Sequence, residues 1–239
     1  ARVMGKAADG EVLATRATLD RSDTLFDTEP LEPFLVKGKS APVHASRVGR
    51  IVGRRSSGQR TTAFVGRAGE LATLRDLLSA ARSGAGGEVE VVGEPGIGKS
   101  RLVEHALGHA PGLRVVRGVC GEYESSTPYY PFRSLLRSAL QLHPQAGADE
   151  VTAQLRRTIA STAPDLAAWL PLLGIPLDLS LPATLETSEL DEQFRKARLE
   201  EVVDELLGRL LTGPSALVVE NAHHMDDSSA DLVSRLARG

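Results

Sequence analysis

The stretch Gly93-Glu94-Pro95-Gly96-Ile97-Gly98-Lys99-Ser100 decides the interpretation of this chain. It follows the pattern G-x-x-x-x-G-K-S, with a β-branched run (Glu88–Val92) before it and a helical pattern (Arg101–Ala110) after it. Glycines let consecutive backbone N–H groups turn toward one point. The N-terminus of the following helix adds its own unpaired N–H groups and the positive end of its dipole. The stretch therefore predicts a phosphate-binding loop between a strand and a helix.

The residues at the end of the loop narrow the ligand to a nucleotide. Lys99 is a point charge that can reach the β- and γ-phosphates, and the Ser100 hydroxyl is a ligand for Mg²⁺. Pro95 restricts the loop and lowers the entropy lost when the loop is ordered. The pattern matches the P-loop motif at every fixed position, so we predict that Gly93–Ser100, together with Arg101, binds ATP with Mg²⁺. The alternative is a glycine-rich turn that contains Lys-Ser by chance, and the flanking strand and helix disfavour it.

A P-loop also requires an acidic residue at the end of a neighbouring strand, where it holds Mg²⁺ through water. The apolar run Ala216–Val219 predicts a buried strand, and Glu220 follows it directly. We predict Ser100 and Glu220 as the Mg²⁺ site, and Lys99, Glu220 and Asn221 as the catalytic residues. The Asn221 amide can position a water molecule but cannot accept a proton. Glu220 must then both bind Mg²⁺ and activate the attacking water, or else ATP hydrolysis is slow.

The stretch His223-His224-Met225-Asp226-Asp227 suggests a metal site, but the spacing is a poor match for metal ligands. Adjacent histidines at an extended strand end are expected to point to opposite sides. We expect instead that Asp226 or Asp227 caps a helix that starts at Ser228-Ser229, and that His223 faces the nucleotide pocket.

Composition excludes several classes of protein. Of 239 residues, 41% are hydrophobic and 25% are charged, and the net charge is −3, so no basic field points to nucleic acid. The single cysteine, Cys120, excludes an internal disulfide framework and is expected to be a buried thiol in a cytoplasmic protein. The most apolar stretch, Leu166–Leu177, is too short to cross a membrane and is interrupted by Pro171 and Pro176. We therefore expect no membrane partner, and we see no signal peptide.

Three zones follow one another along the chain. Residues 1–49 contain short strand-like runs, residues 50–62 are a basic, glycine- and serine-containing linker, and residues 63–239 alternate helices with strands. This alternation predicts an incomplete three-layer αβα parallel sheet of the P-loop type, in the α/β class, preceded by a small α+β unit. The expected strands are Glu11–Ala14, Pro33–Val36, Val43–Val48, Glu88–Val92, Leu113–Cys120 and Ala216–Val219; the strongest expected helices are Leu71–Ala81, Arg101–Ala110, Leu190–Leu211 and Asp231–Ala237.

Residues 64–239 resemble the AAA/STAND signalling ATPases of bacterial cyclases and large LuxR-type regulators. Besides the P-loop, the resemblance rests on Phe64–Arg67, Thr127–Phe132 and Val218–His223. It implies Val65 and Arg67 as contacts of the adenine base. This sequence departs from the family pattern at Asn221, where an aspartate is usual, and at His224, where a tryptophan is usual. Those departures put efficient hydrolysis in question, though not binding.

Residues 1–49 resemble the C-terminal end of a class III adenylate/guanylate cyclase domain. This resemblance rests on the segments Ala1–Met4, Gly10–Leu13, Phe34–Lys39 and Pro42-Val43. The resemblance implies Arg2 as the arginine that stabilises the transferring phosphoryl group, and Lys37 or Lys39 as a triphosphate contact. It also implies a homodimer formed through a complete cyclase domain. The metal-binding aspartates would precede residue 1, so we expect no cyclase activity from this chain.

Three hypotheses follow. The first is a piece of a cyclase–ATPase signalling protein, in which ATP binding gates or reports to the cyclase. The second is a piece of an ATP-switched LuxR-type transcriptional regulator, and the third is a nucleotide-binding scaffold without turnover, suggested by Asn221. The matches at Arg2, Lys37 and Lys39 favour the first.

Overall fold

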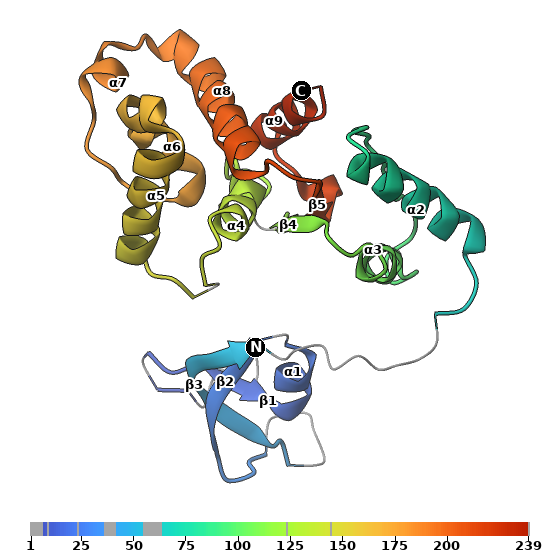
Figure 1. Cartoon of the computed structure of the whole chain (residues 1–239). Helices are drawn as coiled ribbons and strands as arrows, with labels where there is room; N and C mark the ends of the chain where they lie inside the picture. Colours follow the sequence, from blue (N-terminus) through green and yellow to red (C-terminus); the bar gives the residue numbers. More distant parts are fainter. Residues whose placement is uncertain are drawn as a thin grey trace. The chain divides into compact units, whose positions relative to one another are not determined.

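The computed structural model describes residues 7–8, 10–22, 24–35, 42–54, 64–122, 124–143 and 145–238. The chain divides into two compact units, Ala1–Val65 and Gly66–Gly239. Each unit has its own elements, labelled in Figure 1, and each is described by itself.

The first unit is a small antiparallel sheet with one short helix. Its elements are β1 (Leu13–Thr15), α1 (Arg16–Arg21), β2 (Thr24–Pro30) and β3 (Ala45–Arg54), and the strand order is β1-β3-β2. Arg47 on the central strand makes ion pairs with Glu11, at 2.7 Å, and with Glu29 on β2. These ion pairs link β2 and the segment just before β1 to the middle strand.

The sequence predicted this unit only in part. The expected strands Glu11–Ala14 and Val43–Val48 overlap β1 and β3, whereas Phe34 contributes only an isolated bridge to Val43. Strand β2 was missed because its polar run Asp27–Glu29 hides the alternation of a strand. Strand β3 continues to Arg54, so the predicted linker at 50–62 begins too early; its remainder from residue 55 lies outside the described residues.

The second unit is a mixed α/β structure in which a pair of parallel strands meets a helical bundle. Helices α2 and α3 come before the strands in the chain, and most of the bundle lies between the two strands in sequence. The elements are α2 (Ala68–Arg82), α3 (Lys99–Gly108), β4 (Arg114–Val119), α4 (Tyr130–Ala139), α5 (Ala148–Thr162), η2 (Pro164–Trp169), α6 (Leu170–Leu177), α7 (Leu185–Glu189), α8 (Glu192–Leu210), β5 (Ser215–Glu220), η3 (Ala222–His224) and α9 (Asp227–Leu236).

The parallel pair β4–β5 is in register from Arg114↔Ser215 to Val119↔Glu220. Figure 1 shows this pair between the helices α2 and α3 and the bundle that contains α4, α8 and α9. The predicted strand Glu88–Val92 is wrong for this structure, because these residues belong to no strand and Val92 is 79% exposed. Strand propensity reflects packing against neighbours, and this segment pairs with none of the described strands. In the part of the chain that the structure describes, the sheet of this unit therefore has two strands rather than an extended layer.

The core lies in the helical bundle and is joined to β4 by α4. Gly118 permits this contact, because a Cβ atom there would lie 2.9 Å from the carbonyl oxygen of Pro131 at the start of α4. The apolar stretch Leu166–Leu177 packs into the core as η2 and α6, and it retains Pro171 in the first turn of α6 and Pro176 inside the helix. The largest fully buried side chains are Phe132, Leu102, Leu135, Leu136, Leu155, Ile159, Leu166, Leu172, Leu173, Leu177, Leu206 and Leu207. Among the described residues, no helix is long and apolar enough to cross a membrane.

Replacement of Phe132 by alanine should destabilise the second unit strongly. Phe132 is 1% exposed, whereas Phe194 on α8 is 55% exposed. A cavity of this size costs about 3–5 kcal/mol, so Phe132→Ala should lower the urea midpoint of unfolding far more than the matched control Phe194→Ala. Equal effects of the two substitutions would contradict the assignment of the core.

Candidate functional site

The glycine-rich loop 93–98 adopts a backbone that requires glycine at two positions. Gly96 has φ 78° and Gly98 has φ 95°, the left-handed region that side chains with a Cβ avoid. Gly98 is also the N-cap of α3, and its carbonyl accepts the first helical hydrogen bond, from Leu102 N at 3.0 Å. The predicted loop and helix are therefore present, although the strand expected before them is not, and the loop ends at the positive end of the α3 dipole.

Two basic side chains stabilise the loop. Lys99 Nζ donates to the carbonyl oxygens of Gly93, at 2.8 Å, and of Glu94, at 3.1 Å. Arg67 donates from its guanidinium to the Ile97 carbonyl at 2.8 Å. Arg67 therefore lies beside the loop, and its predicted contact with the adenine base stays a prediction. Val65 is 85% exposed and belongs to the first unit, so its predicted role also stays a prediction.

Ser100 and Glu220 are brought together from positions 120 residues apart. Ser100 lies in the first turn of α3, Glu220 is the last residue of β5, and Ser100 Oγ donates to Glu220 Oε2 at 3.3 Å. A hydroxyl and a carboxylate are hard oxygen ligands of the kind that Mg²⁺ prefers. Among the described residues, no group of three or more His, Cys, Asp or Glu side chains forms a metal cage. Mg²⁺ typically takes only one or two protein oxygens besides phosphate and water, so this pair fits it.

Arg117 belongs to the same cluster, and the sequence interpretation missed it. From the middle of β4 it forms ion pairs with Glu104 of α3 at 2.8 Å and with Glu220 at 3.5 Å. The sequence did contain a signal for this residue: apart from Arg114, Arg117 is the charged residue in the otherwise apolar predicted strand Leu113–Cys120. Arg114 instead donates to the carbonyl oxygens of Leu210 and Ala139, so it joins the strand pair to the helices.

Directly after Glu220 the chain turns. Asn221 is left-handed with φ 57°, is exposed and begins η3. The two histidines do not point to opposite sides as predicted: the ring centroids of His223 and His224 lie 3.9 Å apart. The prediction fails because the chain enters a 3-10 turn after β5 instead of continuing as a strand. His223 is exposed, and its predicted orientation toward the nucleotide stays a prediction.

Asp226 joins three elements near the end of β5. It is the N-cap of α9, one of the two candidates that the sequence offered, and accepts hydrogen bonds from Ser229 N (2.9 Å) and Ser229 Oγ (2.6 Å). It also accepts from the backbone N–H of Tyr129, at 3.3 Å. The Tyr129 hydroxyl in turn donates to Glu200 on α8 at 3.3 Å. Burial, and then the charge of Glu200, raises the pKa of Tyr129, which therefore stays protonated.

Cys120 follows β4 and is buried, as predicted. Burial, followed by the charge of Asp226, raises the pKa of its thiol to about 11. A thiol that stays protonated at neutral pH is a poor nucleophile, so Cys120 is a structural residue.

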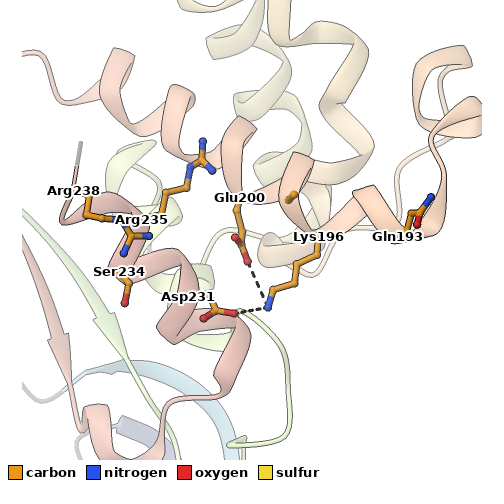
Figure 2. Close-up of a pocket in the computed structure, with 8 residues that line it drawn as sticks. Gln193, Lys196, Glu200, Asp231, Ser234, Arg235 and Arg238 are labelled. Atoms are coloured by element: carbon orange, nitrogen blue, oxygen red, sulfur yellow. Dashed lines mark hydrogen bonds and ion pairs between the residues drawn. The ribbon is translucent and has the colours of Figure 1, made fainter.

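A pocket of about 570 Å³ lies between α8 and α9, and Figure 2 shows its lining. Lys196 in this pocket forms ion pairs with Asp231 and with Glu200, and Arg235 pairs with Asp204 at 3.2 Å. These charges largely neutralise one another, and no residue of the glycine-rich loop lines the pocket. The arrangement of opposite charges links α8 to α9 and does not single out a ligand.

A left-handed glycine loop at a helix N-terminus, with a hydroxyl bonded to a carboxylate at the end of a parallel strand, defines a phosphate- and metal-binding class of site. The family model described as an AAA ATPase domain matches residues 63–239, about three quarters of the chain. The chain therefore belongs to the AAA ATPase domain family and carries an ATP-binding ATPase module. Searches of curated proteins and of solved structures found no significant match.

The family match covers residues 63–239 and gives no support to the cyclase resemblance of residues 1–49. Three residues assigned through the cyclase resemblance, Arg2, Lys37 and Lys39, lie outside the described residues.

Loss of the Asp226 side chain should destabilise the junction of α9 with α4. Asp226→Ala removes three hydrogen bonds and should cost about 2 kcal/mol, the upper end for a helix N-cap. Asp191 is the matched control, because it is the N-cap of α8 but its side chain makes no capping bond within the described part of the chain. Chemical unfolding should therefore show a smaller loss for Asp191→Ala. A loss at Asp191 as large as that at Asp226 would contradict the role of this junction.

Proposed function

We propose that this chain binds Mg·ATP at Gly93–Ser100 and hydrolyses it slowly, so that the bound nucleotide acts as a signal rather than a fuel. The observation that carries the proposal is the hydrogen bond between Ser100 and Glu220, which aligns a hydroxyl and a carboxylate beside the glycine loop. The loop N–H groups and the α3 dipole would bind the phosphates, and Lys99 would neutralise the β- and γ-phosphates. Mg²⁺ would be held by Ser100, with Glu220 reaching it directly or through water, and would supply charge neutralisation at the phosphates.

Slow turnover follows from the residue after the metal carboxylate. Asn221 stands directly after β5, where it can orient a water molecule but cannot remove its proton. Glu220 is a poor substitute for this general base, because the same carboxylate is needed for Mg²⁺. We therefore propose a long-lived ATP-bound state, which is what a switch requires.

Replacement of Lys99 by alanine should abolish most of the affinity for ATP. A charge-assisted hydrogen bond contributes about 1.5–3 kcal/mol, so the dissociation constant should rise about tenfold to a hundredfold. A fluorescent ATP analogue measures this by direct titration. Lys196→Ala is the matched control, since this lysine lies on α8 in ion pairs away from the loop. Unchanged binding in Lys99→Ala would remove the basis for the site.

Replacement of Asn221 by aspartate should raise the rate of hydrolysis. The left-handed backbone at φ 57° tolerates aspartate as well as asparagine, so the substitution is expected to leave the turn intact. A positioned general base contributes about 10²–10⁴-fold, and a gain of tenfold or more in phosphate release would support the proposal. Asn221→Ala supplies the control, because it removes the amide without adding a base and should not gain activity. A wild-type protein as fast as the aspartate variant would contradict the proposed switch.

The attachment of this module to a nucleotide cyclase is a further part of the proposal, supported only by the resemblance of residues 1–49. It predicts that the module controls a cyclase domain of the same polypeptide. The alternative of a LuxR-type regulator has no additional support, because the family match covers the ATPase domain alone.

A further inference from the structure

We propose that Arg117 is a positioning residue that neutralises the Glu220 carboxylate when no divalent cation is bound and releases it to Mg²⁺. This inference rests on the proposed function, because it concerns the metal carboxylate of the same nucleotide site. Arg117 lies on β4 and is not part of the P-loop pattern.

The strand register requires Arg117 and Glu220 to share one face of the sheet. Arg117 is paired with Val218, and Glu220 lies two residues further along β5. Side chains two apart on a strand point to the same face, so Glu220 is the diagonal neighbour of Arg117. A long side chain such as arginine can span this diagonal, as the contact between Arg117 and Glu220 shows.

The two oxygens of Glu220 have different partners. Oε2 accepts from Ser100 Oγ at 3.3 Å, whereas Oε1 lies 3.5 Å from the Arg117 guanidinium. Arg117 approaches Glu104 on α3 more closely, at 2.8 Å. The guanidinium is therefore shared between two carboxylates, and its weaker contact is with the proposed metal ligand.

Because Arg117 is held more closely by Glu104 than by Glu220, Mg²⁺ can replace the guanidinium at Glu220. A divalent ion at Glu220 would repel the guanidinium, and Glu104 can retain it without a large movement. In the absence of Mg²⁺, an unpaired Glu220 would repel the phosphates of ATP. Arg117 removes that repulsion, so it should favour ATP binding without metal and compete with Mg²⁺ for the carboxylate.

The test compares Arg117→Met with wild type as the full 239-residue chain. Titration with a fluorescent ATP analogue in EDTA should show weaker binding by about threefold to fivefold, the effect of one partly exposed ion pair. Affinity in saturating Mg²⁺ should be unchanged, and the Mg²⁺ concentration for half-maximal tightening should fall. Arg117→Lys keeps the cation and should restore the wild-type values in large part.

Glu104→Gln provides the opposite change. It removes the negative charge of the second carboxylate that pairs with Arg117, so the guanidinium should hold Glu220 more firmly and the Mg²⁺ requirement should rise. Arg209→Met is the matched control: Arg209 is 34% exposed, close to the 33% of Arg117, and it also pairs with two carboxylates, Asp165 and Glu205. Its ATP and Mg²⁺ titrations should match wild type.

The outcomes separate the two proposals. Equal weakening of ATP binding by Arg117→Met with and without Mg²⁺ would indicate a structural role and overturn this inference, as would titrations identical to wild type. Either result leaves the proposed ATP site standing. A wild-type chain that binds no nucleotide under either condition would overturn the proposed function and this inference with it.

Discussion

The parallel pairing of β4 with β5 is the constraint on which the site depends. Its register ends at Val119↔Glu220, and the backbone N–H of Cys120 donates to the Glu220 carbonyl at 2.9 Å. This pairing fixes where β5 ends and hence where the Glu220 carboxylate emerges. The carboxylate then meets Ser100 in the first turn of α3. Residues 120 positions apart are thereby brought into contact, and the chain between them contributes β4 and the helices α4 to α8.

The same strand end connects the site to that bundle. Asn221 turns the chain into η3, and Asp226 then caps α9 while accepting a hydrogen bond from Tyr129 at the start of α4. Ion pairs of Lys196 with Asp231 and of Arg235 with Asp204 join α9 to α8. A change in the position of Glu220 therefore has a short, hydrogen-bonded route to the helices.

Local chemistry explains what the sequence could predict. The loop was predictable because Gly96 and Gly98 are needed for a left-handed backbone, and the helix α8 because its apolar residues recur at helical spacing. The Asp226 cap was predictable from a short-range rule about helix starts. In each case the physical cause lies within a few neighbouring residues, so a single sequence carries it.

What the sequence could not predict depends on contacts between distant residues. The valines of Glu88–Val92 have strand propensity, yet this segment pairs with none of the described strands, and propensity alone does not provide a partner. The role of Arg117 is visible only after the β4–β5 register places it diagonal to Glu220. The expected opposite orientation of His223 and His224 was wrong because the chain turns directly after the strand ends. No residue near Asn221 signals that turn as strongly as a glycine or proline would.

The central claim is that the glycine loop, Lys99, Ser100 and Glu220 together form a Mg·nucleotide site. The most direct measurement is a crystal structure of this chain with Mg²⁺ and a non-hydrolysable ATP analogue. The account predicts the triphosphate in the loop, Mg²⁺ on Ser100 Oγ, and Lys99 Nζ moved from the carbonyls of Gly93 and Glu94 to a phosphate oxygen. An analogue bound elsewhere, or Lys99 still held by those two carbonyls beside a bound nucleotide, would contradict it.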